Sequence, residues 1–191
     1  MRIAVSGTHC CGKSTLIDQF LLAHPDFAHE PEPYLVLEED YGEVFAAVPS
    51  AEDFYRQLEF NVSRLRCYKA GEKVIYERSP VDFLAYLLAL DDLGRDEEAS
   101  RLGDRSLGIV REAIQLLDLI VFLPINERDG SGAPELEDLE LRSEVNRRLE
   151  GILIEDDFDL FGSDRPVILE AVGTTGQRVA MVERATDYRF F

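Results

Sequence analysis

The chain has 191 residues, 46% of them hydrophobic, and its 20 basic and 38 acidic residues give a formal net charge of -18. This charge repels long polyanions, which excludes duplex nucleic acid and lipid head-group layers as main partners, whereas a small nucleotide needs only a local basic pocket. The length fits a single domain over residues 1–191, and we expect a cytoplasmic protein because the apolar stretches are too short to cross a bilayer and no N-terminal signal is recognisable.

Strands and helices are predicted to alternate along the chain. Short apolar segments indicate five strands, and the periodic segments between them indicate six helices. In chain order the expected elements are a strand at 2–6, a helix at 13–23, a strand at 27–30, a helix at 51–70, a strand at 73–77, helices at 80–90 and 104–117, a strand at 119–123, a helix at 136–153, a strand at 167–171 and a helix at 175–185. This alternation predicts an α/β fold whose parallel sheet is covered on both faces and whose ligand site lies at the carboxyl ends of the strands.

The first predicted strand leads directly into a phosphate-binding loop. Residues 7–14 read G-x-x-x-x-G-K-S, in which backbone N–H groups around Gly7 and Gly12 wrap a nucleotide phosphate. Lys13 would reach the β- and γ-phosphates, and the Ser14 hydroxyl would bind Mg²⁺, so we expect ATP and Mg²⁺ at this site. The expected nucleotide contacts of this loop are Gly7, Thr8, Cys10, Cys11, Gly12, Lys13, Ser14 and Thr15.

This loop in this position is typical of the P-loop NTPases. It predicts their three-layer fold, with a five-stranded sheet in the order 2-3-1-4-5. The two cysteines inside the loop are interpreted as small loop fillers, with a thiol open to oxidative inactivation as the alternative.

Charged residues follow the second and third predicted strands. Glu30 and Glu32 each precede a proline at the end of the second strand, and Glu77 with Arg78 ends the third. A carboxylate at this edge can bind a Mg²⁺-bound water or take a proton from an attacking hydroxyl, and an arginine can neutralise phosphoryl oxygens. A solvated acidic turn and a surface ion pair are the structural alternatives.

The predicted helix at 51–70 carries a polar stripe. Gln57, Asn61 and Arg64 are spaced by four and three residues and therefore share one face. The neighbouring apolar stripe predicts the face toward the core. The polar stripe fits either an acceptor pocket or a solvated helix face.

These residues together resemble the deoxynucleoside kinases, within the P-loop nucleoside and nucleotide kinase group. The segments at 31–33 (Pro-Glu-Pro) and 77–79 (Glu-Arg-Ser) resemble two signature motifs of that family, and the segment at 57–66 resembles its helix with a base-reading glutamine. The segment at 76–90 also resembles bacterial small-molecule kinases of the nicotinamide-riboside kinase type and other ATP-binding proteins.

The resemblance implies roles for individual residues. It implies that Glu32 is the general base on the acceptor hydroxyl, with Glu30 as the alternative, that Glu77 lies near Mg²⁺ and that Arg78 binds phosphates. The acceptor-binding set is Glu30, Glu32, Gln57, Asn61, Arg64 and Arg78.

Two positions depart from the family pattern. Phe83 stands where the family has a base-selecting acidic residue, and Asp82 lies one position earlier. The family's aromatic residue after Pro-Glu-Pro has no counterpart at the expected place, although Tyr34 and Tyr41 lie near.

The second half is consistent with a kinase. Residues 125–150 are predicted to form a lid that excludes water, with Arg128 and Arg142 acting on the transferring group, and an exposed acidic loop is the alternative. Gly173 and Thr174, after the last strand, are expected beside the adenine, as in this group.

The sequence therefore predicts an ATP- and Mg²⁺-dependent kinase that phosphorylates a hydroxyl of a nucleoside-like or nucleotide-like acceptor. The alternative is an NTP-dependent regulatory switch without an acceptor. Asp118 precedes the fourth strand rather than following it, which argues against the switch. A homodimer is one option for the oligomeric state.

Overall fold

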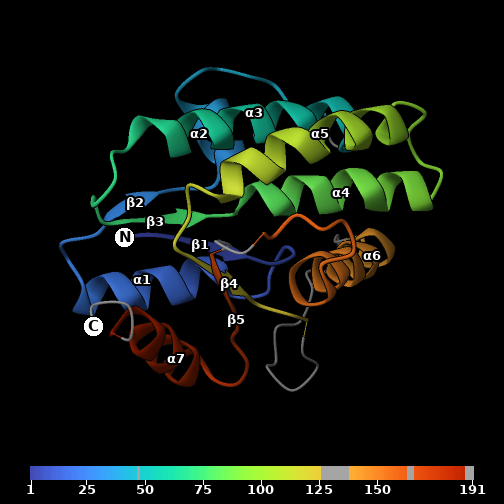
Figure 1. Cartoon of the computed structure of the whole chain (residues 1–191). Helices are drawn as coiled ribbons and strands as arrows, with labels where there is room; N and C mark the ends of the chain where they lie inside the picture. Colours follow the sequence, from blue (N-terminus) through green and yellow to red (C-terminus); the bar gives the residue numbers. More distant parts are fainter. Residues whose placement is uncertain (47, 126–137, 163–165, 188–191) are drawn as a thin grey trace.

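The computed structural model describes residues 1–46, 48–125, 138–162 and 166–187, and its centre is a parallel β-sheet (Figure 1). Five strands pair in the order β2-β3-β1-β4-β5, which confirms the predicted topology. The strands are β1 Arg2–Ser6, β2 Ala28–Glu30, β3 Val74–Glu77, β4 Leu119–Phe122 and β5 Val167–Glu170. All carboxyl ends of a parallel sheet meet at one edge, so the loops that carry the predicted site converge there.

Helices cover both faces of this sheet. They are α1 Lys13–Ala23, α2 Pro33–Glu39, α3 Ala51–Cys67, α4 Pro80–Asp92, α5 Ala99–Ile114, α6 Leu139–Glu150 and α7 Thr175–Asp187, and α6 continues as the π-helical turn Gly151–Glu155. In Figure 1, α3, α4 and α5 lie on one face, and α1 and α7 lie on the other. The three-layer α/β prediction is therefore confirmed.

Alternation along the strands creates two cores. Ala4 of β1 packs with Ile120 and the helices α3 to α5, whereas Ile3 and Val5 pack against α1 and α7. Successive strand residues point to opposite faces, so a near-continuous apolar strand is the pattern that a doubly covered sheet requires. These cores hold the strand ends, and hence the site, in fixed positions.

Several boundaries differ from the predictions for identifiable reasons. The helix α3 ends at Cys67 because Tyr68 turns to extended backbone (φ -94°, ψ 140°). The helix α5 starts earlier than predicted, at Ala99, which is fully buried, and it ends at Ile114, whose carbonyl accepts the Leu117 N–H in a turn (3.0 Å). The helix α2 was not predicted, because its seven residues are too few for a clear helical period.

Serine caps fix the starts of two site-bearing helices. Ser50 begins α3 and Ser79 begins α4, each in a capping box with an acidic residue three positions on. Such boxes satisfy two backbone donors that a helix start leaves open. They fix where the first turn of each helix faces the sheet edge.

Asp118 lies at the opposite edge of the sheet from the phosphate-binding loop. Its carboxylate accepts the Arg2 N–H (2.8 Å), and its own N–H donates to the Arg2 carbonyl (2.9 Å). It therefore joins β1 to β4 at their amino ends. Across the described residues, no helix is long and apolar enough to cross a membrane.

Candidate nucleotide and acceptor site

The phosphate-binding loop lies between β1 and α1 with the backbone its sequence requires. Gly7 (φ +153°) and Gly12 (φ +91°) adopt conformations that favour glycine, and a Cβ at Gly7 would lie 2.6 Å from Cys11 Sγ and 2.8 Å from the Leu123 carbonyl oxygen. The Lys13 ammonium donates to the Thr8 carbonyl (2.8 Å). The loop is thus closed on itself, with its buried lysine in place.

The two cysteines of the loop differ in exposure. Cys11 is buried, which raises the pKa of its thiol, and Cys10 is exposed at φ +54°. A buried, protonated thiol is unreactive, so Cys11 fits the interpretation as a loop filler. Thr15 is exposed at the start of α1, directly after Ser14.

Ser14 and Glu77 bring two oxygen-bearing side chains together at the start of α1. The Ser14 hydroxyl donates to Glu77 Oε1 (2.9 Å), and Glu77 ends β3 with only 6% of its surface exposed. Mg²⁺ in such sites takes one or two protein oxygens and completes its shell with phosphate oxygens and water. These two residues therefore fit the predicted metal site.

Arg78 is the most constrained residue at this edge. Its side chain is 2% exposed, and its backbone is left-handed (φ +73°), a conformation that costs a non-glycine residue about 1–2 kcal/mol. The guanidinium pairs with Glu32 and donates to the Gly7 carbonyl (3.2 Å), and Asp82 lies 3.5 Å away. The surrounding contacts thus hold a strained residue between the phosphate-binding loop and Glu32.

The charge of Glu32 is set by this neighbourhood. Burial alone would raise the pKa of its carboxyl, but the positive charges of Arg78 and Lys13 outweigh burial and lower the pKa to about 2. Glu32 is therefore ionised at neutral pH. It lies at the N-cap of α2, directly before Pro33 at the first helical position.

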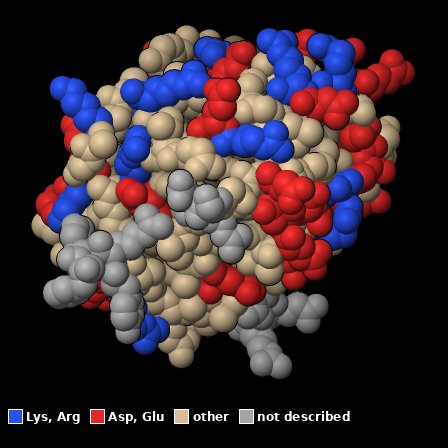
Figure 2. Space-filling model, viewed as in Figure 1, with Lys and Arg blue, Asp and Glu red and all other residues tan. Residues whose placement is uncertain are grey.

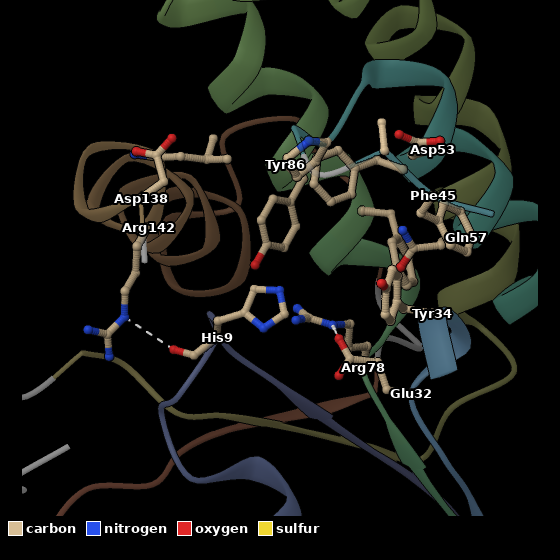
Figure 3. A pocket seen from close by; sticks show the side chains of 15 residues that line it. His9, Glu32, Tyr34, Phe45, Asp53, Gln57, Arg78, Tyr86, Asp138 and Arg142 are labelled. Carbon is tan, nitrogen blue, oxygen red and sulfur yellow. Dashed lines mark hydrogen bonds and ion pairs between the residues drawn. The ribbon is translucent and has the colours of Figure 1, made fainter. Parts of the chain in front are cut away.

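A cavity of about 450 Å³ opens from Glu32 and Arg78 toward α3 and α4 (Figure 3). Two aromatic pairs form its walls: Phe54 stacks on Tyr86 with ring centroids 4.3 Å apart, and Tyr34 packs on Phe45 at 4.9 Å. The remaining lining residues are His9, Glu32, Ala46, Pro49, Asp53, Gln57, Arg78, Phe83, Asp138, Leu141 and Arg142. The size and the aromatic walls suit a small planar molecule.

Of the predicted polar stripe on α3, only Gln57 lines this cavity. Its amide makes no hydrogen bond with the described residues, although Gln57 is only 6% exposed. Asn61, one turn further on, donates to the Arg78 carbonyl (3.2 Å) and so holds the strained backbone. The prediction that the whole stripe faces one pocket is wrong, because the cavity spans only the first half of α3.

Glu30 and Arg64 form a separate cluster with Tyr68. Arg64 donates two hydrogen bonds to the Glu30 carboxylate (2.8 and 2.6 Å), and the Tyr68 hydroxyl donates to the same carboxylate. These residues join the end of β2 to α3. Neither Glu30 nor Arg64 lines the cavity, in contrast to the expectation for both.

The positions that depart from the family pattern have distinct places. Asp82 is fully buried and accepts the Gly7 N–H (3.0 Å) and the Ser79 N–H (2.9 Å), so it joins the phosphate-binding loop to the start of α4. Phe83 lines the cavity. Tyr34 is a cavity wall, whereas Tyr41 is 62% exposed and packs on Phe60.

The predicted lid is described only from residue 138 onward. Arg142 of α6 lines the cavity, and its Nε donates to the His9 carbonyl (3.1 Å). Arg128 lies outside the described residues. Gly173 (φ +98°) and Thr174 form the exposed turn after β5, where the Thr174 N–H donates to Gln177 Oε1 (2.9 Å).

Three residues at this site were not predicted. His9 and Tyr86 line the cavity, and Arg178 of α7 donates to the Cys11 carbonyl (2.9 Å) from the other side of the phosphate-binding loop. His9 occupies one of the unspecified positions of the G-x-x-x-x-G-K-S motif, so the motif predicts no role for it. Helical periodicity does not predict which residues Tyr86 and Arg178 contact, because each contact depends on the tertiary packing of a helix against the loop.

The fold was compared with known proteins. Neither a protein-family model nor a curated protein matches the sequence. Among solved structures, deoxyadenosine kinase from M. mycoides with its products dCMP and dCDP is 16% identical, with a TM-score of 0.68 over 98% of this chain and 100% of that chain. The chain has the fold of the nucleoside and nucleotide kinases.

Two further structures share this kinase fold. Thymidylate kinase from Candida albicans has a TM-score of 0.65 at 15% identity over 98% of this chain and 91% of that chain. The NadR protein in complex with NR has a TM-score of 0.58 at 19% identity, over 97% of this chain and 51% of that chain. At identities this low, the likeness shows a shared fold and no shared activity, so the activity depends on the residues of the site.

Proposed function

We propose that the protein is an ATP- and Mg²⁺-dependent kinase that transfers the γ-phosphoryl group of ATP to a hydroxyl of a nucleoside-like small molecule. The observation that carries this proposal is one continuous site: the cavity of about 450 Å³ runs from aromatic walls and Gln57 to the Glu32–Arg78 pair, which adjoins the phosphate-binding loop. A nucleotide switch has no need of a second, aromatic pocket beside its phosphates.

The donor nucleotide would bind at the loop. Backbone N–H groups between Gly7 and Ser14 and the positive end of α1 favour phosphate, and Lys13 would exchange the Thr8 carbonyl for phosphate oxygens. Ser14 and Glu77 would hold Mg²⁺, which neutralises charge on the phosphates when bound. The exposed turn at Gly173 and Thr174 is proposed to lie beside the adenine.

The acceptor would bind in the cavity with its hydroxyl at Glu32. A carboxylate with a pKa of about 2 is a weak base, so it accepts a hydrogen bond from the hydroxyl first and takes the proton only as the new P–O bond makes that hydroxyl acidic. Arg78 holds Glu32 in place and neutralises developing negative charge. The free amide of Gln57 would read the edge of the acceptor's ring.

Closure over the site would fall to the segment around α6. Arg142 already reaches the His9 carbonyl from that helix, and Arg128 is proposed to act with it on the transferring group. A closed lid excludes water and so prevents loss of ATP by hydrolysis.

The proposed acceptor is a small molecule. The face shown in Figure 2 has acidic side chains interspersed among its basic ones, in keeping with the net charge of -18.

An acceptor screen tests this function. Purified protein with ATP and Mg²⁺ is incubated with deoxynucleosides, ribonucleosides, nicotinamide riboside and nucleoside monophosphates, and ADP formation is followed. ADP that depends on one acceptor class supports the kinase, and Lys13→Ala should abolish it. Slow ADP release that is indifferent to every acceptor would favour the NTP-dependent switch instead.

A further inference from the structure

His9 is the residue of the phosphate-binding loop that faces the cavity. In Figure 3 its imidazole lies between the Tyr86 hydroxyl and the Arg78 guanidinium, on the cavity side of the loop. Its carbonyl oxygen accepts the Arg142 Nε–H (3.1 Å), so the backbone of His9 is tied to α6. A loop whose backbone is built to bind phosphate therefore also presents one side chain to the acceptor cavity.

The imidazole has an aromatic contact but no hydrogen-bond partner on its ring. Its ring packs edge-on against Tyr86, with centroids 6.3 Å apart and planes at 65°. Neither ring nitrogen makes a hydrogen bond with the described residues. Two nitrogens are thus available to a ligand, at the point where the loop and the cavity meet.

The surroundings keep this ring uncharged. His9 as a whole is exposed, but desolvation of its imidazole beside the cavity lowers its pKa to about 4; Arg78, Lys13 and Arg142 add to that effect, and Glu32 opposes it. A neutral imidazole has one N–H donor and one lone-pair acceptor. A hydroxyl, which also donates and accepts, matches both, whereas a phosphate oxygen can only accept.

The position of His9 along the cavity indicates which part of an acceptor it meets. The aromatic pairs and Gln57 line one end, and the reacting hydroxyl belongs at Glu32 beside the loop. His9 lines the cavity on the other side of the Arg78 guanidinium from Glu32, toward Arg142 (Figure 3). The reacting hydroxyl of a nucleoside-like molecule belongs to its sugar, and Arg78 adjoins both Glu32 and His9, so His9 meets the sugar rather than the ring.

We propose that His9 is a specificity-determining residue that binds a second, non-reacting hydroxyl on the sugar-like part of the acceptor. The proposal rests on the kinase function proposed above and deepens it: the acceptor carries at least two hydroxyls, one at Glu32 and one at His9. The phosphate-binding loop then recognises the acceptor as well as the donor.

Paired acceptors and a ring-preserving variant test this. The wild type and His9→Phe are compared on the best nucleoside from the screen and on its analogues that each lack one non-reacting sugar hydroxyl, at saturating ATP. Phenylalanine keeps the ring contact with Tyr86 but has no ring nitrogen. The wild type should prefer the full acceptor over one analogue by about 3- to 10-fold in kcat/KM, the worth of one hydrogen bond, and His9→Phe should bring that ratio close to one.

In His9→Phe the lower kcat/KM should come from a higher KM for the acceptor, and the KM for ATP should not change. His29→Phe makes the same change at an exposed residue of β2 that does not line the cavity, so it is the matched control and should keep the wild-type ratio. Equal ratios in the wild type and His9→Phe for every analogue would overturn the role of His9 while leaving the kinase function intact.

A binding measurement separates failure of the two proposals. If no acceptor in the screen is phosphorylated, the kinase function fails, and binding of the same nucleosides is then measured by calorimetry with a non-hydrolysable ATP analogue present. Binding that weakens about 3- to 10-fold in His9→Phe supports the contact, and equal or absent binding overturns it.

Discussion

Two trios of the same residue types lie at the edge where β2 and β3 end. The cavity trio is Glu32, Arg78 and Tyr86, and the buttress trio is Glu30, Arg64 and Tyr68. Each has a glutamate before a proline, an arginine that pairs with it and a tyrosine beside the pair. They differ in surroundings: the cavity trio adjoins the phosphate-binding loop, whereas the buttress trio joins β2 to α3.

Exposure and backbone strain follow this difference. The Arg78 side chain is 2% exposed and sits on a left-handed backbone, whereas that of Arg64 is 38% exposed on a regular helix. A protein tolerates strain where several contacts hold it, and strained residues cluster at functional sites. Residue type and local sequence therefore do not distinguish a functional site from a structural ion-pair cluster. The residues that surround each trio make that distinction.

The largest expected effect breaks the equivalence of the two glutamates. Glu32→Gln should lower kcat by about 10²- to 10⁴-fold with little change in ATP binding, because it removes the base that receives the acceptor proton. Glu30→Gln is the matched control and should keep kcat within about 3-fold, because a brace acts on stability. Steady-state kinetics on the acceptor identified by the screen measures both.

The opposite result has a definite meaning. If Glu30→Gln is crippled and Glu32→Gln is active, Glu30 is the base and the alignment of the Pro-Glu-Pro segment is shifted by two residues.

A second contrast concerns the arginines. Arg78→Lys should lower kcat by about 10²-fold, because lysine offers a single point of charge where the guanidinium contacts Glu32, Gly7 and Asp82 together. Arg64→Lys should leave kcat near the wild-type value, since its two hydrogen bonds serve the buttress trio. Equal losses of kcat in the two variants would show that the trios do not differ in function.

The acid stability of the cavity trio gives a third test. The Glu32 pKa of about 2 lies below its ordinary value of 4.5, so folding favours the ionised form. That stabilisation is fully present above about pH 5 and is lost as the pH falls toward 2. Glu32→Gln should therefore lower the free energy of unfolding on the order of 2 kcal/mol at pH 7, and by much less at pH 3.

Urea titrations at several pH values measure this difference. A gap between wild type and Glu32→Gln that stays constant from pH 7 to pH 3 would contradict the lowered pKa.

The sequence predicts the strands and helices of this site better than it predicts which side chains contact one another. The helix at 13–23 and the sheet order are confirmed: the helix follows from a local pattern with a physical cause, and the sheet order follows from the likeness of residues 7–14 to the loop of P-loop NTPases. Strand ends also locate both glutamates. Which glutamate faces the cavity depends on Arg78 and Arg64, which lie 46 and 34 residues away in sequence, and no local pattern encodes that choice.

The same limit explains the missed residues. Helical spacing correctly puts Gln57, Asn61 and Arg64 on one face, but it does not say what lies opposite each turn. Along α3 the opposite neighbour changes from the cavity at Gln57 to the Arg78 backbone at Asn61 and to Glu30 at Arg64. His9 lines the cavity in contact with Tyr86 of α4 and Arg142 of α6, two residues far from it in sequence.

The smallest expected effect separates the two tyrosines. Tyr68→Phe should lower the free energy of unfolding by about 1 kcal/mol, because Glu30 loses a hydrogen bond from the Tyr68 hydroxyl in a partly exposed setting. Tyr86→Phe should change it by less than about 0.5 kcal/mol, since phenylalanine keeps the ring that lies 5.3 Å from the Arg78 guanidinium and stacks on Phe54. Thermal and urea unfolding of the two variants, at the same pH, compare them directly. A greater loss in Tyr86→Phe would mean that the hydroxyl, rather than the ring, supports Arg78, and that the cavity trio is braced in the same way as the buttress trio.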